Sequence, residues 1–216
     1  MLPFVLQPAE ELSVLCLGAH CDDIEIGCGG TILKLLGSRK HSRLHWTVFC
    51  SNPERKKSAL QSAHAFLAGA PAQIEVMDFR DGFLPDQWRE AKEQFELLKS
   101  RVQPDVIFTP FRRDLHQDHR TISDLTWNTF RNHNILEYEI VKFDGDLGAP
   151  NFFVPLDETL LKRKTQLIIE NFRTEAERTW FSEETFRALA KIRGIECNAP
   201  AGYAEAFYCR KMSFAF

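Results

Sequence analysis

Two short segments hold most of the side chains that could carry out chemistry. Residues 18–30 read GAHCDDIEIGCGG and contain one histidine and three carboxylates, His20, Asp22, Asp23 and Glu25. Residues 111–120 read FRRDLHQDHR and contain two histidines and two carboxylates, Asp114, His116, Asp118 and His119. Adjacent carboxylates repel each other, so a folded protein keeps them together only where positive charge offsets them. A divalent cation supplies that charge, and histidine with aspartate is a donor set typical of catalytic zinc sites.

Each segment also has an interpretation without a metal. The Asp–Asp pair can cap a helix that begins at Thr31, through the exposed N–H groups of its first turn. A histidine in a loop at the end of a strand is commonly a hydrogen-bonded surface residue. The GCGG cluster does not match the dinucleotide pattern G-x-G-x-x-G, and it can simply allow a helix to pack closely on a strand.

The elements around these segments alternate between strands and helices. Apolar runs predict strands over residues 12–18, 44–50, 73–79, 105–110, 136–143, 151–156 and 205–214. Helical spacing and capping residues such as Asp157 and Ser182 predict helices over residues 31–40, 53–69, 85–103, 157–172 and 182–194. This order predicts an α/β fold with a mostly parallel central sheet covered on both faces.

Both chemical segments follow predicted strands, residues 12–18 and 105–110. In open α/β sheets, ligands bind at the carboxyl ends of parallel strands, so we expect the two segments to meet there. His116 and His119 are three residues apart, so one helical turn can direct both toward a single point.

These residues carry a resemblance to a known family. AHCDDIEIGCGGTI resembles the A-H-P-D-D-x-E-x-G-x-G-G motif of the LmbE-like (PIG-L) family of zinc-dependent N-acetylglucosaminyl deacetylases, and HQDH resembles its second metal motif, H-x-D-H. Softer matches at residues 53–69, 79–85 and 193–211 extend the resemblance nearly end to end. It implies a Rossmann-like three-layer fold formed by a single LmbE-like deacetylase domain over residues 1–216.

The resemblance implies a role for each matching residue. The zinc ligands are His20, Asp23 and His119, and Fe²⁺ suits the same donors. Asp22 is the general base that takes a proton from the water that zinc activates.

Four further residues have implied roles in the reaction or in substrate binding. His116, as an imidazolium, stabilises the oxyanion or donates a proton to the leaving amine, and Asp118 orients it. Arg55 and Asp81 contact the substrate.

Two positions depart from the family pattern. Cys21 stands where the family has proline, in the loop that sets the ligands. Ser58 stands where the helix usually offers glutamate after its arginine, so Arg55 lacks its customary partner.

The expected reaction is the hydrolysis of an acetamide on an N-acetylated sugar, the small-molecule partner. Phe83 and Trp88 follow a predicted strand end and are either core residues or a stacking wall for the sugar ring. Two alternatives stay open, a zinc amidase for a non-sugar amide and a catalytically degenerate sugar-binding protein. A nucleotide-binding Rossmann protein is excluded because Asp22 and Asp23 would repel the pyrophosphate.

Composition and charge exclude several classes of function. The net charge of −3 and the pI near 6.2 give no basic surface, so we expect no nucleic-acid partner. No apolar run is long enough to span a bilayer, and the first 14 residues lack a signal-peptide core, so we expect a cytoplasmic protein. Residues 151–156 and the C-terminal strand could form an interface with a second copy.

Overall fold

A seven-stranded sheet forms the centre of the computed structural model, which describes residues 11–39 and 42–213. The strands are β1 (Ser13–Gly18), β2 (Arg43–Cys50), β3 (Ala72–Phe79), β4 (Val106–Pro110), β5 (Asn134–Tyr138), β6 (Phe152–Leu156) and β7 (Tyr203–Cys209). Their order across the sheet is β3-β2-β1-β4-β5-β7-β6. Strands β1 to β5 pair in parallel, whereas β7 runs antiparallel to both β5 and β6. The predicted α/β fold with a mostly parallel sheet is confirmed.

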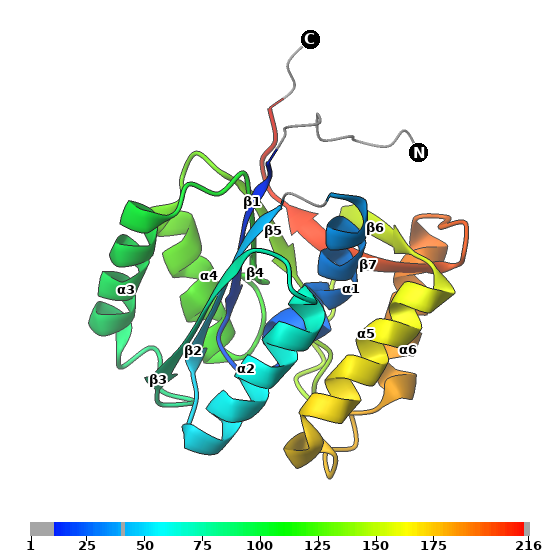
Figure 1. Cartoon of the computed structure of the whole chain (residues 1–216), viewed down its shortest axis with the longest axis horizontal. Coiled ribbons are helices and arrows are strands. Elements are labelled where there is room, and N and C mark those ends of the chain that lie inside the picture. The colour runs from blue at the N-terminus through cyan, green and yellow to red at the C-terminus, as the bar shows by residue number, and fades with distance from the viewer. Residues whose placement is uncertain (1–10, 40–41, 214–216) are drawn as a thin grey trace.

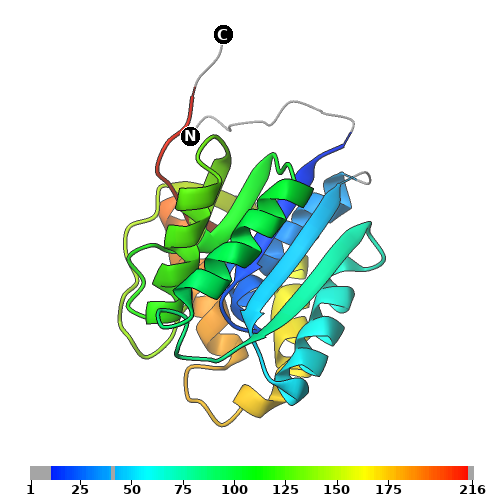
Figure 2. The ribbon, with the colours of Figure 1, turned by 90° about the vertical axis from the view of Figure 1, so that its left-hand side faces the viewer.

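Helices cover both faces of this sheet (Figures 1 and 2). They are α1 (Asp23–Ser38), α2 (Pro53–Leu67), α3 (Trp88–Arg101), α4 (Gln117–Thr129), α5 (Glu158–Asn171) and α6 (Glu183–Glu196), with a short 3-10 helix η1 (Arg173–Glu175) after α5. Helices α3 and α4 lie on one face, and α1, α2, α5 and α6 lie on the other. Each face has its own apolar core, which gives the predicted three layers. The predicted helix caps at Asp157 and Ser182 are confirmed, since each side chain accepts a backbone N–H of the first turn. No helix in the described part of the chain is long and apolar enough to cross a membrane.

The order of the strands reverses between β1 and β4: the chain adds β2 and β3 on one side of β1, and then β4 and β5 on the other side. The chain leaves β1 into α1 on one face and leaves β4 into α4 on the opposite face (Figure 2). Two loops that diverge in this way open a crevice at the carboxyl ends of the strands. Both chemical segments of the sequence therefore begin at this crevice.

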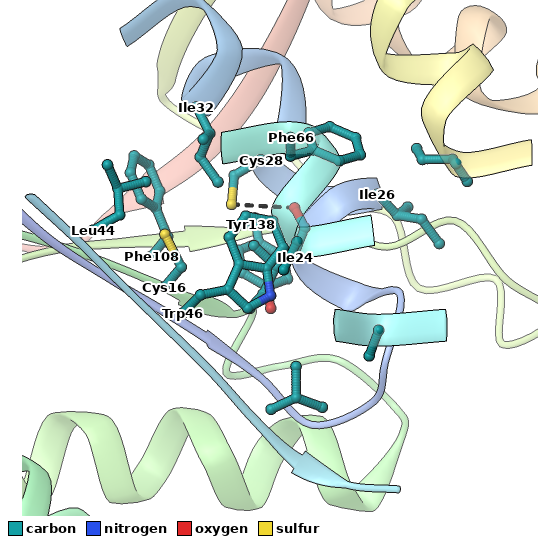
Figure 3. Packing of buried hydrophobic residues seen from close by; sticks show 14 of the residues in the cluster. Cys16, Ile24, Ile26, Cys28, Ile32, Leu44, Trp46, Phe66, Phe108 and Tyr138 are labelled. Carbon is teal, nitrogen blue, oxygen red and sulfur yellow. Dashed lines mark hydrogen bonds between the residues drawn. The ribbon is translucent and has the colours of Figure 1, made fainter. Parts of the chain in front are cut away.

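The start of α1 differs from the sequence-based expectation. The helix begins at Asp23 rather than at Thr31, and the GCGG cluster lies inside it. Glycine is needed there for packing: a Cβ on Gly27 would lie 2.1 Å from the Tyr138 ring, and one on Gly29 would lie 2.6 Å from Phe66. Figure 3 shows both rings close to Cys28. The close-packing interpretation of these glycines is confirmed, and the predicted helix start at Thr31 is wrong.

These contacts predict opposite effects for two glycines of α1. Gly27→Ala should lower the free energy of unfolding by about 1–3 kcal/mol, because its methyl group would displace Tyr138 from a filled core. Gly37 has nothing within 4 Å of its virtual Cβ, so Gly37→Ala should raise stability by up to about 0.5–1 kcal/mol. Urea unfolding followed by circular dichroism measures both. A Gly27→Ala protein as stable as Gly37→Ala would contradict this packing.

Strand β5 also ends earlier than expected, at Tyr138 rather than at residue 143. Glu139 turns out of the sheet and accepts hydrogen bonds from the Arg193 guanidinium of α6, both at 2.8 Å. The next residues can then follow the carboxyl edge of the sheet, where Lys142 and Phe143 reach a cavity. Strand β7 ends at Cys209, and the end of the expected strand, residue 214, lies outside the described residues.

Candidate metal and catalytic site

Three histidines from the two chemical segments meet at the crevice. His20 follows β1, His116 caps the N-terminus of α4, and His119 lies in its first turn. Their ring centroids are 4.7–5.0 Å apart, and one nitrogen from each ring lies within 4.8 Å of the others. The sequence prediction that the loops after residues 18 and 110 come together is confirmed.

Asp23 joins His20 and His119 in a tight group of donor atoms. His20 Nδ1 lies 3.1 Å from His119 Nε2, which lies 3.3 Å from Asp23 Oδ1, and Asp23 Oδ2 lies 3.6 Å from His20 Nδ1. Donors bound tetrahedrally to zinc at about 2.0–2.1 Å stand about 3.3 Å apart. The three groups therefore have the spacing of one ion's ligands. A second group of donors lies beside it, His20, Asp81, His116 and Asp118.

The paired aspartates do not act as helix caps. Asp22 is the N-cap residue of α1, but its side chain makes no capping hydrogen bond. Asp23 Oδ2 instead accepts the backbone N–H of His20 at 2.8 Å. The capping interpretation is therefore wrong, and both buried carboxylates face the site.

The carboxylates around His20 and His119 favour positive charge on these two rings. Burial alone would lower the pKa of His119, but Asp23 and Asp114 raise it to about 9. Burial likewise opposes protonation of His20, yet Asp23, Asp118 and Asp81 hold its pKa well above the ordinary value. Carboxylates that favour protons on these rings also favour a cation among them.

Asp114 also belongs to the site, although the sequence analysis predicted no role for it. Its Oδ2 lies 2.9 Å from His119 Nδ1 and 2.9 Å from Lys142 Nζ. Lys142 also donates to Asp146 at 2.7 Å. A carboxylate behind a ligand histidine fixes the orientation of the ring, and the position of Asp114 five residues before His119 was the only signal for it.

The contacts of Asp118 differ from the expected ones. Its carboxylate lies 3.2 Å from His20 Nε2 and accepts the N–H groups of Gly82 and Leu84 at 2.7 and 3.0 Å. Burial would raise its pKa, but these bonds hold it below the ordinary value. The Asp118 carboxylate thus orients His20 and the loop after β3, and no described contact joins this carboxylate to His116, the ring that it was expected to orient.

His116 is in surroundings that oppose a positive charge. Burial lowers its pKa, and so do the neighbouring rings of His20 and His119. Its Nδ1 accepts the backbone N–H of Asp118 at 3.2 Å, which leaves Nε2 as the nitrogen available to the cavity that the residue lines. These surroundings favour the neutral imidazole over the expected imidazolium.

Arg55 and Asp81 both reach the site. Arg55 donates to Asp81 at 3.0 Å, and Asp81 lies 3.2 Å from His20 Nε2. The bond to His20 lowers the pKa of Asp81 to about 2. Although Ser58 replaces the family's glutamate, Arg55 has another carboxylate within 3.5 Å, that of Glu175.

Cys21 is a buried residue whose thiol donates to the Cys50 carbonyl at 3.6 Å. Burial raises its pKa to about 12, so the thiol stays protonated. It replaces the family's proline without adding a charged group.

A cavity of about 290 Å³ lies above these groups. Its outer wall comes from segments without any recognised motif, and includes Phe143, Glu175, Arg178 and Trp180. Neither alternative for Phe83 and Trp88 is confirmed, because neither residue lines the cavity and both are exposed. The Phe83 ring lies under the Arg80 guanidinium at 3.6 Å.

Comparison with known proteins decides the family. Residues 15–130 match the family model PIG-L, described as GlcNAc-PI de-N-acetylase. The chain belongs to the PIG-L family. The matched region contains all eight residues for which the resemblance implies a role. The outer wall of the cavity comes from residues after 130.

Solved structures share the fold of this PIG-L protein at low identity. The N,N'-diacetylchitobiose deacetylase from Pyrococcus horikoshii is 22% identical with a TM-score of 0.70, covering 90% of this chain and 82% of that one. The zinc-inhibited form of teicoplanin deacetylase is 12% identical (TM-score 0.69, 91% and 97% covered). The 4-carboxy-2-hydroxymuconate hydratase from Pseudomonas putida KT2440 is 15% identical (TM-score 0.74, 95% and 98% covered). Because one of the three is a hydratase, the fold alone does not decide the reaction.

Proposed function

We propose that this PIG-L protein is a metal-dependent hydrolase that removes the acetyl group from an N-acetylated, N-acetylglucosaminyl-type sugar. The observation that carries the proposal is the convergence of His20, Asp23 and His119, with Asp22 beside them, at one end of a cavity. The description of the family as a de-N-acetylase supports the reaction. The chitobiose deacetylase with the same fold supports a sugar substrate.

The donors His20, Asp23 and His119 would hold the metal, and Zn²⁺ and Fe²⁺ both suit this set. When bound, such an ion lowers the pKa of water to about 7 and polarises a carbonyl oxygen. Asp114 would keep the ring of His119 in the required orientation.

Asp22 is the proposed general base. Burial raises its pKa, and repulsion from Asp23 raises it further, while Arg55 opposes the shift. A raised pKa brings a carboxylate closer to the operating pH, which favours proton abstraction. Its side chain makes no capping bond, so its oxygens are available to a water in the cavity.

His116 is proposed to act on the opposite side of the reacting amide. A neutral imidazole with a proton on Nε2 can donate a hydrogen bond to the oxygen of the tetrahedral intermediate. The proton that Asp22 takes from the attacking water would then pass to the leaving amine, while His116, whose Nδ1 is fixed by the backbone of α4, keeps its own proton and its hydrogen bond to that oxygen.

The sugar would lie against the outer wall of the cavity. Phe143 is 70% exposed there, and an exposed aromatic face can pack on the apolar face of a pyranose ring. Phe143→Ala should raise KM roughly 3- to 10-fold and leave kcat within about twofold, because stacking is lost equally from the ground and transition states. Phe83→Ala, an exposed aromatic outside the cavity, is the matched control. Equal kinetics in wild type and Phe143→Ala would contradict this placement.

A substrate panel tests the proposed reaction. Acetate release is measured with N,N'-diacetylchitobiose, simple N-acetylglucosaminides and non-sugar acetamides. We expect turnover of the sugars. Turnover of the non-sugar acetamides alone would support the amidase alternative, and sugar binding without turnover would support the degenerate binder. The single domain, the cytoplasmic location and the interface with a second copy stay predictions.

A further inference from the structure

A buried carboxylate reaches the site from the short helix η1, late in the chain. Glu175 ends the short helix η1, is 6% exposed and lines the cavity. It lies outside residues 15–130, which contain the family motifs. Nothing in the sequence around it resembles a catalytic pattern.

Glu175 contacts the arginine that joins the two sides of the site. Its Oε1 lies 3.5 Å from Arg55 Nη2, and its Oε2 lies 2.6 Å from Arg178 Nε. Arg55 Nη2 also lies 3.8 Å from Asp22, while Nη1 donates to Asp81 at 3.0 Å. One nitrogen of the guanidinium is thus shared between Glu175 and the proposed base.

We propose that Glu175 is a positioning residue that holds Arg55 between Asp22 and Asp81. This inference rests on the proposed function of the site. An arginine side chain has many rotamers, and its planar fork is useful only when each edge has a fixed partner. Ser58 provides no carboxylate on α2, so Glu175 supplies one from η1.

Loss of this partner would misplace the guanidinium. When glutamine replaces Glu175, Asp22 is the charged group that remains beside Arg55 Nη2 among the described contacts. The guanidinium would then move closer to Asp22. The carboxylate that must accept a proton from water would then be occupied by the arginine. Both carboxylate oxygens of Glu175 already contact arginines, Arg55 and Arg178, so its loss should lower kcat rather than raise KM.

The test is a double-mutant cycle in the metal-loaded full chain, with acetate release from the best sugar of the panel as the readout. Glu175→Gln should lower kcat roughly 5- to 30-fold, the range expected for two coupled side chains, with KM and metal content within about twofold of wild type. Glu175→Asp keeps the charge and should lose less. In an Arg55→Ala background, Glu175→Gln should cost less than about twofold, because its effect passes through Arg55.

The matched control is Glu158→Gln, which removes the charge of an exposed partner of Arg187. Its kcat should stay unchanged. Three results would overturn the inference: unchanged kcat in Glu175→Gln, equal losses in Glu175→Gln and Glu175→Asp, or the same loss with and without Arg55. A wild-type protein that deacetylates no sugar overturns the proposed function instead, and this inference with it.

Discussion

Asp22→Asn should lower kcat by about two to four orders of magnitude while the metal stays bound. Asparagine has nearly the same shape as aspartate but cannot accept the proton of the attacking water. The proposed ligands are His20, Asp23 and His119, so the substitution leaves the proposed ligand set complete. Steady-state acetate release and metal content, measured on the same preparation, check both parts of the expectation.

Asp86→Asn is the matched control for this substitution, since Asp86 is exposed and lies outside the cavity. Its kcat should equal that of wild type. Normal turnover by Asp22→Asn would remove Asp22 from the role of base. Loss of the metal in Asp22→Asn would instead make Asp22 part of the ligand set.

His119→Ala should abolish stoichiometric metal binding and, with it, acetate release. His119 is 2% exposed, and its Nε2 lies 3.1 Å from His20 Nδ1 and 3.3 Å from Asp23 Oδ1. Its removal leaves two donors, fewer than the three protein ligands of a catalytic zinc site. Metal content by elemental mass spectrometry after gel filtration measures the loss.

His64→Ala, on the exposed side of α2, is the control and should retain the metal. Circular dichroism confirms that the His119→Ala protein is folded, and His119→Gln serves as a second variant that better preserves volume. Full metal occupancy in both His119 variants would show that the ligand set is wrong.

The meeting of the two loops could be predicted from the sequence because the place of each loop depends on the strand directly before it. Each loop follows an apolar strand, and parallel strands bring their carboxyl ends to one edge. His20 and His119 therefore converge although 99 positions separate them. The start of α1 was misplaced at Thr31 for the converse reason: the cost of glycine in a helix is local, whereas the rings of Tyr138 and Phe66 that require it come from distant elements.

Side-chain partners were harder to predict than positions. Asp118 was placed correctly in the site, but its oxygens bond the amides of Gly82 and Leu84, which belong to a loop that its own segment does not specify. Phe143 and Glu175 reach the cavity only because β5 ends early and α5 ends in η1. Neither feature has a spacing rule in the sequence.

The most direct test of the central claim is acetate release as a function of metal occupancy. The protein is stripped with a chelator, reloaded with increasing Zn²⁺ or Fe²⁺, and assayed with N,N'-diacetylchitobiose and other N-acetylglucosaminides. We predict that the rate rises in proportion to bound metal up to about one ion per chain, the stoichiometry of a single three-donor site. Equal rates in stripped and loaded protein, or no acetate from any sugar at full occupancy, would contradict the account.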